Sequence, residues 1–238
     1  MKNFSLFSRR IFMRPWKRTL PVPFLIGGII TVLLVSFYGG TLLAPLTGEI
    51  NGLILSSCAA NLLLFGAIFF FPPRGEGAAR VGFRKVGKGD LVLCVESLLI
   101  MLAVSALLGY FWQQILDFLL IPYEKEQSLL QLAKGADGYA FVRIFLLTAM
   151  LVPLMEELVF RRFLYDLLLR LGAPVAFVGT ALIFSAAHGF LLGIPGLFFM
   201  GIVFQTVCNV TRNLWCSIIT HAMLNSSVLI MTWFLKEG

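Results

Sequence analysis

The sequence predicts an all-α membrane protein, a polytopic bundle of about seven transmembrane helices with its N-terminus in the cytoplasm. Of the 238 residues, 59% are hydrophobic and only 13% are charged, whereas a soluble domain of this size needs more charged residues to cover its surface. The apolar residues gather in runs of roughly 20, the length that a helix needs to cross the hydrocarbon core. No stretch shows the alternation of a membrane β-barrel.

Each long apolar run is interpreted as one span. The seven predicted spans are residues 20–44, 50–72, 91–115, 139–160, 173–190, 193–210 and 213–235. The fifth and sixth are short and rich in glycine, so their boundaries are the least sharply defined. The first is longer than the apolar part of a signal peptide and is interpreted as a retained helix.

The same pattern divides the chain into three parts. Residues 1–19 form a basic cytoplasmic arm, residues 20–138 an N-terminal transmembrane region, and residues 139–235 a C-terminal transmembrane core that carries the candidate site.

The positions of Lys and Arg predict the orientation, because cytoplasmic loops are enriched in these residues. The N-terminal arm holds six of them, the segment 73–90 five and the segment 161–172 three, and Arg212 lies in the last hairpin. The segment 116–138 holds only Lys125 and Lys134 beside four acidic residues. We therefore expect the N-terminus inside, the C-terminus outside, and 116–138 as an external loop with a short amphipathic helix.

The distribution of charge and cysteine excludes several classes of protein. The net charge of +7 comes from short basic segments between apolar runs, which sets membrane orientation and gives no indication of nucleic-acid binding. None of the four cysteines forms a Cys-x-x-Cys pair, so neither disulfides nor a thiolate metal site is indicated. The chain carries no eukaryotic targeting signal, and we expect it in a bacterial cytoplasmic (inner) membrane.

Several ionisable side chains lie inside the predicted spans, where charge is costly and usually functional. Glu156 and Glu157 are adjacent in the fourth span, and the chain's two histidines, His188 and His221, lie in later apolar runs. One histidine alone could be structural, and a Glu–Arg pair alone could simply join helices. Two carboxylates, both histidines and Asn225 together indicate a reaction centre.

Helical spacing separates the roles of these groups. Glu157 and Arg161 are four residues apart with the glutamate first, the favourable order for an ion pair within a helix. Glu156 lies about 100° around the helix and is left as the free carboxylate that a general base needs. His221 and Asn225 are also four apart, so they face the same direction and could donate hydrogen bonds to one point.

A predicted helical hairpin brings Glu156 and His188 to the same depth. Gly172 begins a turn, and Glu156 and His188 lie 16 residues before and after it. A polar stripe of Arg162, Asp166 and Arg170 predicts that the tip of this hairpin projects from the membrane. Pro153 is expected to bend the helix or to free a backbone carbonyl near the site.

Three motifs carry a family resemblance. Glu156-Glu157-x-x-x-Arg161, Phe184-x-x-x-His188 and His221-x-x-x-Asn225 resemble, in order, the motifs of the CAAX-protease and bacteriocin-processing family, also called the CPBP or Abi family. The resemblance covers roughly residues 140–230. It implies an intramembrane endopeptidase of the glutamate type, a hydrolase that cuts a membrane-anchored or lipidated protein or peptide.

The resemblance also implies a role for each residue. Glu156 would activate a water molecule, and His188 would help to hold or deprotonate it. His221 and Asn225 would donate hydrogen bonds to the oxyanion formed on the scissile carbonyl.

In the same scheme, Glu157 and Arg161 maintain the helix geometry and the charge balance, and no metal or other cofactor is required. The nearest alternative is a zinc protease, in which two histidines and a glutamate bind the metal, although the usual His-Glu-x-x-His helix is missing. A catalytically silent regulator or immunity protein of the same fold is a second alternative. A secondary transporter is the third, although the sequence shows no repeated halves.

Overall fold

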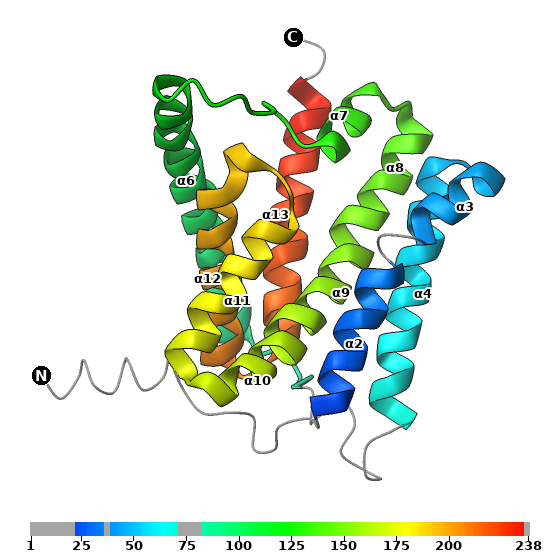
Figure 1. Ribbon diagram of the computed structural model, residues 1–238, viewed down its shortest axis with the longest axis vertical. Helices are drawn as coiled ribbons and strands as arrows, with labels where there is room; N and C mark the ends of the chain where they lie inside the picture. Colours follow the sequence, from blue (N-terminus) through cyan, green and yellow to red (C-terminus); the bar gives the residue numbers. More distant parts are fainter. Residues whose placement is uncertain (1–21, 36–38, 71–81, 236–238) are drawn as a thin grey trace, which may run out of the picture.

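The computed structural model describes residues 22–35, 39–70 and 82–235, which form helices joined by short connections, with no strand in these ranges (Figure 1). The N-terminal helices are α2 (Val22–Leu34), α3 (Gly40–Thr47) and α4 (Glu49–Phe70). They are followed by α6 (Lys88–Phe118) and α7 (Ser128–Gly135). The C-terminal helices are α11 (Ala173–Ala187), α12 (Ile194–Thr211) and α13 (Leu214–Phe234).

A single long helix, called the central helix here, covers Gly138–Leu171. Its consecutive segments are α8 (Gly138–Leu146), η2 (Leu147–Leu151), α9 (Val152–Glu157), η3 (Leu158–Leu164), α10 (Tyr165–Leu168) and η4 (Leu169–Leu171). Gly172, with φ of 112°, ends it, a conformation that favours glycine. The fourth predicted span is therefore correct in position but ends eleven residues too early, because the apolar pattern breaks at Arg161 while the helix continues.

Four helices in the described ranges are long and apolar enough to cross a membrane. They are Lys88–Phe118, Gly138–Leu171, Leu191–Thr211 and Leu214–Phe234. Ile50–Leu63 and Ala173–Ala187 are apolar but shorter. The all-helical membrane architecture is thus confirmed, whereas the total of seven spans and the cytoplasmic N-terminus stay predictions.

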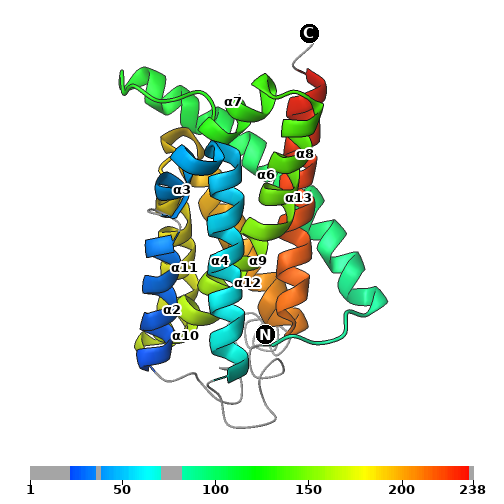
Figure 2. The ribbon, with the colours of Figure 1, turned by 90° about the vertical axis from the view of Figure 1, so that its right-hand side faces the viewer.

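The first predicted span lies only partly within the described residues. The run 20–44 contains α2 and the beginning of α3, and residues 36–38 between them lie outside the described residues. The predicted basic arm, residues 1–19, lies outside the described residues. The predicted short helix of the 116–138 loop is present as α7, which lies across one end of the bundle (Figure 2).

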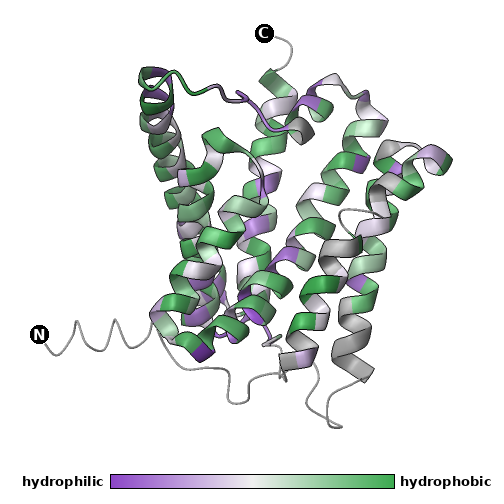
Figure 3. Ribbon diagram, viewed as in Figure 1, coloured by the Kyte–Doolittle hydropathy of each residue, from purple (hydrophilic) through white to green (hydrophobic). Residues whose placement is uncertain are grey.

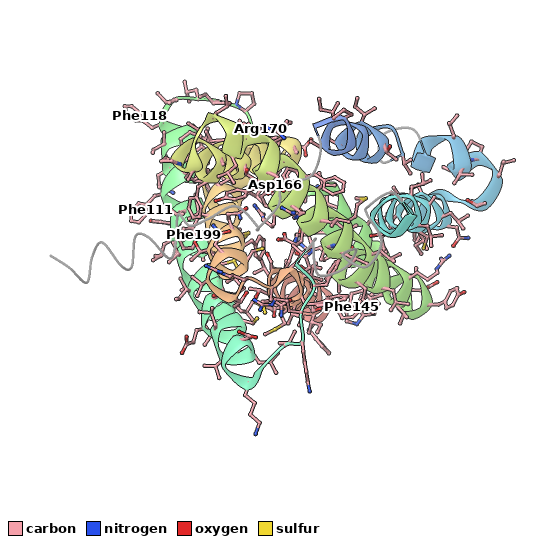
Figure 4. All side chains as sticks on the ribbon, turned by 90° about the horizontal axis from the view of Figure 1, so that it is seen from below. Phe111, Phe118, Phe145, Asp166, Arg170 and Phe199 are labelled. Carbon is pink, nitrogen blue, oxygen red and sulfur yellow. The ribbon has the colours of Figure 1, made fainter. Side chains whose placement is uncertain are left out.

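The central helix lies between two groups of helices, as Figure 4 shows from below. On one side, α4 contacts α8, η2 and α9, and α2 contacts η3. On the other side, α13 contacts η2 and α9, while α11 and α12 contact η3. A residue on the central helix can therefore be held from both sides.

Hydrophobic residues cover the outside of the bundle, and hydrophilic ones gather along α13 and around α9 and α10 (Figure 3). Phe111 and Phe118 of α6 point away from the bundle, and Phe118 is 85% exposed (Figure 4). Such a surface is suited to lipid and not to water. The polar groups are therefore inside, where they need partners.

The predicted polar stripe at the hairpin tip is wrong for two of its three members. Arg162 and Asp166 are fully buried and form an ion pair with each other, whereas Arg170 is exposed. Arg162 and Asp166 share one face of the helix, as their spacing predicted. This face packs inside the bundle, because the two opposite charges compensate each other there. The stripe therefore gives no support to a tip that projects from the membrane.

Candidate active site

The carboxylate of Glu157 is completely buried and accepts three side-chain hydrogen bonds. Arg161 Nε donates to Oε2 over 2.9 Å, and Ser217 Oγ donates to the same oxygen. His221 Nδ1 lies 2.9 Å from Oε1. The ion pair expected from the spacing of Glu157 and Arg161 is present, and it is connected to α13 by Ser217 and His221.

The contact with Glu157 sets the tautomer of His221. A carboxylate can only accept a hydrogen bond, so the proton of this contact lies on His221 Nδ1. The other ring nitrogen, Nε2, lies 3.9 Å from Oε2 of Glu156. His221 therefore lies between the two adjacent glutamates, one held closely and the other slightly beyond hydrogen-bond distance.

Glu156 lies in different surroundings from its neighbour. Its side chain is 20% exposed, and its Oε2 atom is buried without a hydrogen-bond partner. Oε2 and His221 Nε2 are too far apart for a direct hydrogen bond. The free carboxylate predicted from helical spacing is the one that lacks a partner in the structure.

His188 makes its contacts with its own helix. Its Nδ1 atom lies 2.8 Å from the Phe184 carbonyl oxygen, and its ring centroid lies 4.6 Å from that of Phe184. A carbonyl only accepts, so Nδ1 carries the proton and Nε2 of the neutral ring keeps its lone pair. Within the described ranges, His188 is not within ion-pair distance of Glu156, and their common depth stays a prediction.

Asn225 lies on α13 one turn beyond His221, as expected, but its amide is already bonded. Its Nδ2 atom donates to the Thr148 carbonyl oxygen over 2.9 Å. One of the two amide hydrogens is used in this contact, and one remains. The predicted convergence of His221 and Asn225 on a single point stays a prediction.

Aromatic rings enclose the charged groups. Phe204 stacks on His221 with ring centroids 4.6 Å apart. The guanidinium of Arg161 lies 4.8 Å from the Phe184 ring centroid and 5.5 Å from that of Phe204. Its two terminal nitrogens have no hydrogen-bond partner, so these ring faces provide the electrostatic contact for this side of the cation.

The sequence prediction missed Ser217 and Phe204. Ser217 precedes His221 by four residues, so it continues the stripe of His221 and Asn225 along α13. Extending the helical spacing one turn backwards would have found it. Phe204 has no such signal, because one phenylalanine among 23 cannot be recognised as a histidine partner from sequence.

No group of three His, Cys, Asp or Glu side chains in the described part of the chain is placed to hold a metal ion. The side chains named for the zinc alternative are engaged differently: His221 is bonded to Glu157, and His188 to a backbone carbonyl. We derive no step through a metal.

The C-terminal half of the chain is similar to a known family. Residues 138–227 match the family model described as type II CAAX prenyl endopeptidase, Rce1-like. Searches of curated proteins and of solved structures gave no match. The match confirms the resemblance to the CAAX-protease and bacteriocin-processing family, and it covers the Glu156, His188 and His221 motifs together. With four helices that can span a bilayer, the chain is an integral membrane protein, and its residues 138–227 are similar to a family of proteases.

Proposed function

We propose that this chain, whose residues 138–227 belong to the Rce1-like CAAX protease family, is an intramembrane endopeptidase that uses a glutamate-activated water molecule. The observation that carries the proposal is the unpartnered carboxylate oxygen of Glu156, 3.9 Å from His221 Nε2. Glu157 fixes the ring of His221 from the other side. This arrangement has a carboxylate oxygen without a partner beside an imidazole whose orientation is fixed.

In the proposed reaction, Glu156 takes a proton from the water molecule as its oxygen attacks the scissile carbonyl carbon. Nε2 of His188 has a free lone pair and helps to orient the same water. The proton held by Glu156 is then delivered to the leaving amine, so the carboxylate is regenerated when the C–N bond breaks. The scheme uses no metal and no cofactor.

The oxyanion of the tetrahedral intermediate needs donors, and His221 and Asn225 are proposed to provide them. His221 can donate from Nε2 only when both ring nitrogens carry protons. Asn225 can donate its second amide hydrogen while the first stays bonded to Thr148. The four side chains of Glu156, Glu157, Arg161 and protonated His221 then carry no net charge, which suits an interior site.

The substrate is proposed to be a membrane-anchored or lipidated protein or peptide. The polar site is enclosed by helices whose outer surface is apolar, so a substrate bond reaches it most readily from within or beside the bilayer. A lipid chain near the cleaved bond would keep the substrate at that depth. We place the chain in a bacterial cytoplasmic membrane with its N-terminus inside.

The decisive experiment compares wild type with Glu156→Gln, expressed at equal levels in the native host and analysed by mass spectrometry of protein termini. Gln keeps the size of the side chain and removes its basicity. We expect at least one new terminus that depends on wild type and disappears with Glu156→Gln. Glu96→Gln is the matched control, because Glu96 is an exposed glutamate in the apolar helix α6, and it should behave as wild type.

Identical terminus profiles for wild type and Glu156→Gln, together with a phenotype of the deletion strain that both proteins restore, would overturn the proposal. The chain would then act by binding a membrane partner, as a regulator or immunity protein does.

A further inference from the structure

The central helix has one π-helical segment about one helical turn before the two glutamates and a second, Leu158–Leu164, directly after them. Residues 147–151 form a π-helical turn, in which the N–H of Val152 bonds to the carbonyl of Leu147, five residues back. The next residue, Pro153, has no N–H to offer to the Thr148 carbonyl. Such turns cost stability and are retained mainly where function needs them.

Two asparagine side chains stabilise this turn from opposite sides. Asn225 of α13 donates to the Thr148 carbonyl, the one that Pro153 leaves without a backbone donor. Asn61 of α4 donates to the Leu151 carbonyl over 3.1 Å and to the Ser57 carbonyl of its own helix over 2.9 Å. The turn is thus held between the N-terminal region and α13.

Asn61 is only 6% exposed, and its hydrogen bonds to Ser57 and Leu151 both use Nδ2, while Oδ1 is buried without a partner. A buried amide with an unsatisfied oxygen is costly in an apolar bundle. It lies beside Ala60, which belongs to the same core cluster as Met155 and Leu158 around the glutamates. It also lies outside the segment 138–227 that matches the protease family.

We propose that Asn61 is a positioning residue that maintains the π-helical turn and thereby fixes the direction of Glu156 and Glu157. Its catalytic consequence depends on the proposed function. Each residue of an α-helix turns the chain by about 100°. If the π turn became α-helical, the helix that follows it would therefore rotate by about 100°, the angle between two neighbouring residues. Glu156 and Glu157 are adjacent, so such a rotation would bring one of them to the direction that the other now has, and would turn the other away by about 100°.

The inference gives the N-terminal region a role in the site. Through Asn61, α4 supports the catalytic helix at the point where its hydrogen bonding is irregular, and α4 contacts η2 and α9 on the side opposite α13. The N-terminal region would then be required for catalysis even though it provides no group that touches substrate.

The test uses Asn61→Asp and Asn61→Leu in the full chain, in vesicles of phosphatidylethanolamine and phosphatidylglycerol. Asp replaces the donor by an acceptor facing two carbonyls, and Leu removes the polar group without adding charge. Asn51→Asp is the matched control, because Asn51 is exposed on the same helix and uses its oxygen to accept from Arg143. The probe is a fluorogenic peptide with a farnesylated cysteine near its C-terminus.

For both Asn61 variants we expect kcat to fall by about tenfold or more with KM changed by less than about twofold, since the groups that act are displaced while binding is kept. Hydrogen exchange of the full chain in detergent should rise in residues 147–157 and stay unchanged in α12. Asn51→Asp should show neither effect. Wild-type kcat and unchanged exchange in the Asn61 variants would overturn the inference, and exchange raised throughout the chain would do so as well, because the residue would then only stabilise the fold.

The two proposals fail separately. If wild type does not cleave the farnesylated probe, the proposed cleavage of lipidated peptides fails. Hydrogen exchange in residues 147–157 then still tests the role of Asn61 without any measurement of activity. A local rise supports this role, and no change overturns it.

Discussion

At the scale of single residues, the two adjacent glutamates have opposite surroundings. Glu157 is buried and holds three donors, so its charge is compensated and its position is fixed. Glu156 is partly exposed and has an oxygen without a partner. A group that must exchange protons needs an environment like that of Glu156. A group that orients other side chains needs an environment like that of Glu157.

Substitution of Ser217 tests how strongly peptidase activity depends on the position of Glu157. Ser217→Ala removes one donor to a buried carboxylate, a loss of about 1.5–3 kcal/mol for a hydrogen bond to a charged group. We expect peptidase activity to fall by about tenfold or more as His221 loses its fixed orientation. Ser217→Thr keeps the hydroxyl and should recover much of the activity. Ser227→Ala, which removes a hydroxyl bonded only to the Met223 carbonyl of its own helix, should leave activity unchanged.

Substitution of Arg161 tests how strongly the stability of the protein depends on compensation of the Glu157 charge. Arg161→Met leaves the carboxylate of Glu157 without its cation in a fully buried site, and removal of one partner of such a pair costs about 3–5 kcal/mol. The midpoint of thermal unfolding in detergent should fall clearly for Arg161→Met. The double variant Glu157→Gln/Arg161→Met should be more stable than Arg161→Met alone. Equal midpoints for the single and double variants would show that the pair does not determine stability.

Sequence could predict part of this site for a physical reason. Residues four apart on a helix face the same direction, which identified the pair of Glu157 and Arg161 and would have identified Ser217. Spacing does not say what a face meets, so Arg162 and Asp166 were expected at a projecting tip and are buried instead. The stacking of Phe204 on His221 depends on three-dimensional packing, and no pattern in the sequence predicts it.

At the scale of helices, α11 and α12 pack closely at a glycine. A Cβ atom on Gly201 would lie 3.0 Å from both Cα and Cβ of Ala181, a distance that forces the two helices apart. Gly201→Ala should lower the free energy of unfolding by about 1–3 kcal/mol. Gly109→Ala in α6 is the control, since a Cβ there meets nothing within 4 Å, and it should be neutral or slightly stabilising. Chemical denaturation of the purified protein in detergent measures both changes.

The helices could be located from apolar runs, but their ends and irregularities could not. The hydrophobic length that identifies a span does not require the helix to end at the membrane surface, so the central helix continues from 160 to Leu171. The π turn at 147–151 depends on side chains from α4 and α13, and a local pattern cannot contain that information. In the sequence, Pro153 is the local indication, as a position expected to bend the helix or to free a backbone carbonyl.

At the scale of the whole molecule, charge is unequal between the two ends of the bundle. Successive helices of the C-terminal part run in opposite directions (Figure 1). Lys88 at the start of α6, Arg170 before Gly172 and Arg212 between α12 and α13 therefore belong to one end. The connection from α6 to the central helix, which includes Glu124 and Lys125, belongs to the other end.

This asymmetry predicts the orientation in the membrane, because Lys and Arg stay on the cytoplasmic side during insertion. In a variant without the four native cysteines, Lys125→Cys should react with a membrane-impermeant maleimide in intact cells. Arg212→Cys should react only after the membrane is opened. Both positions are exposed in the structure, so a difference in labelling reports sidedness and not burial. The reverse pattern would place the basic end outside, and the hairpin that carries Glu156 and His188 would then open towards the opposite compartment, where a different set of lipidated proteins is found.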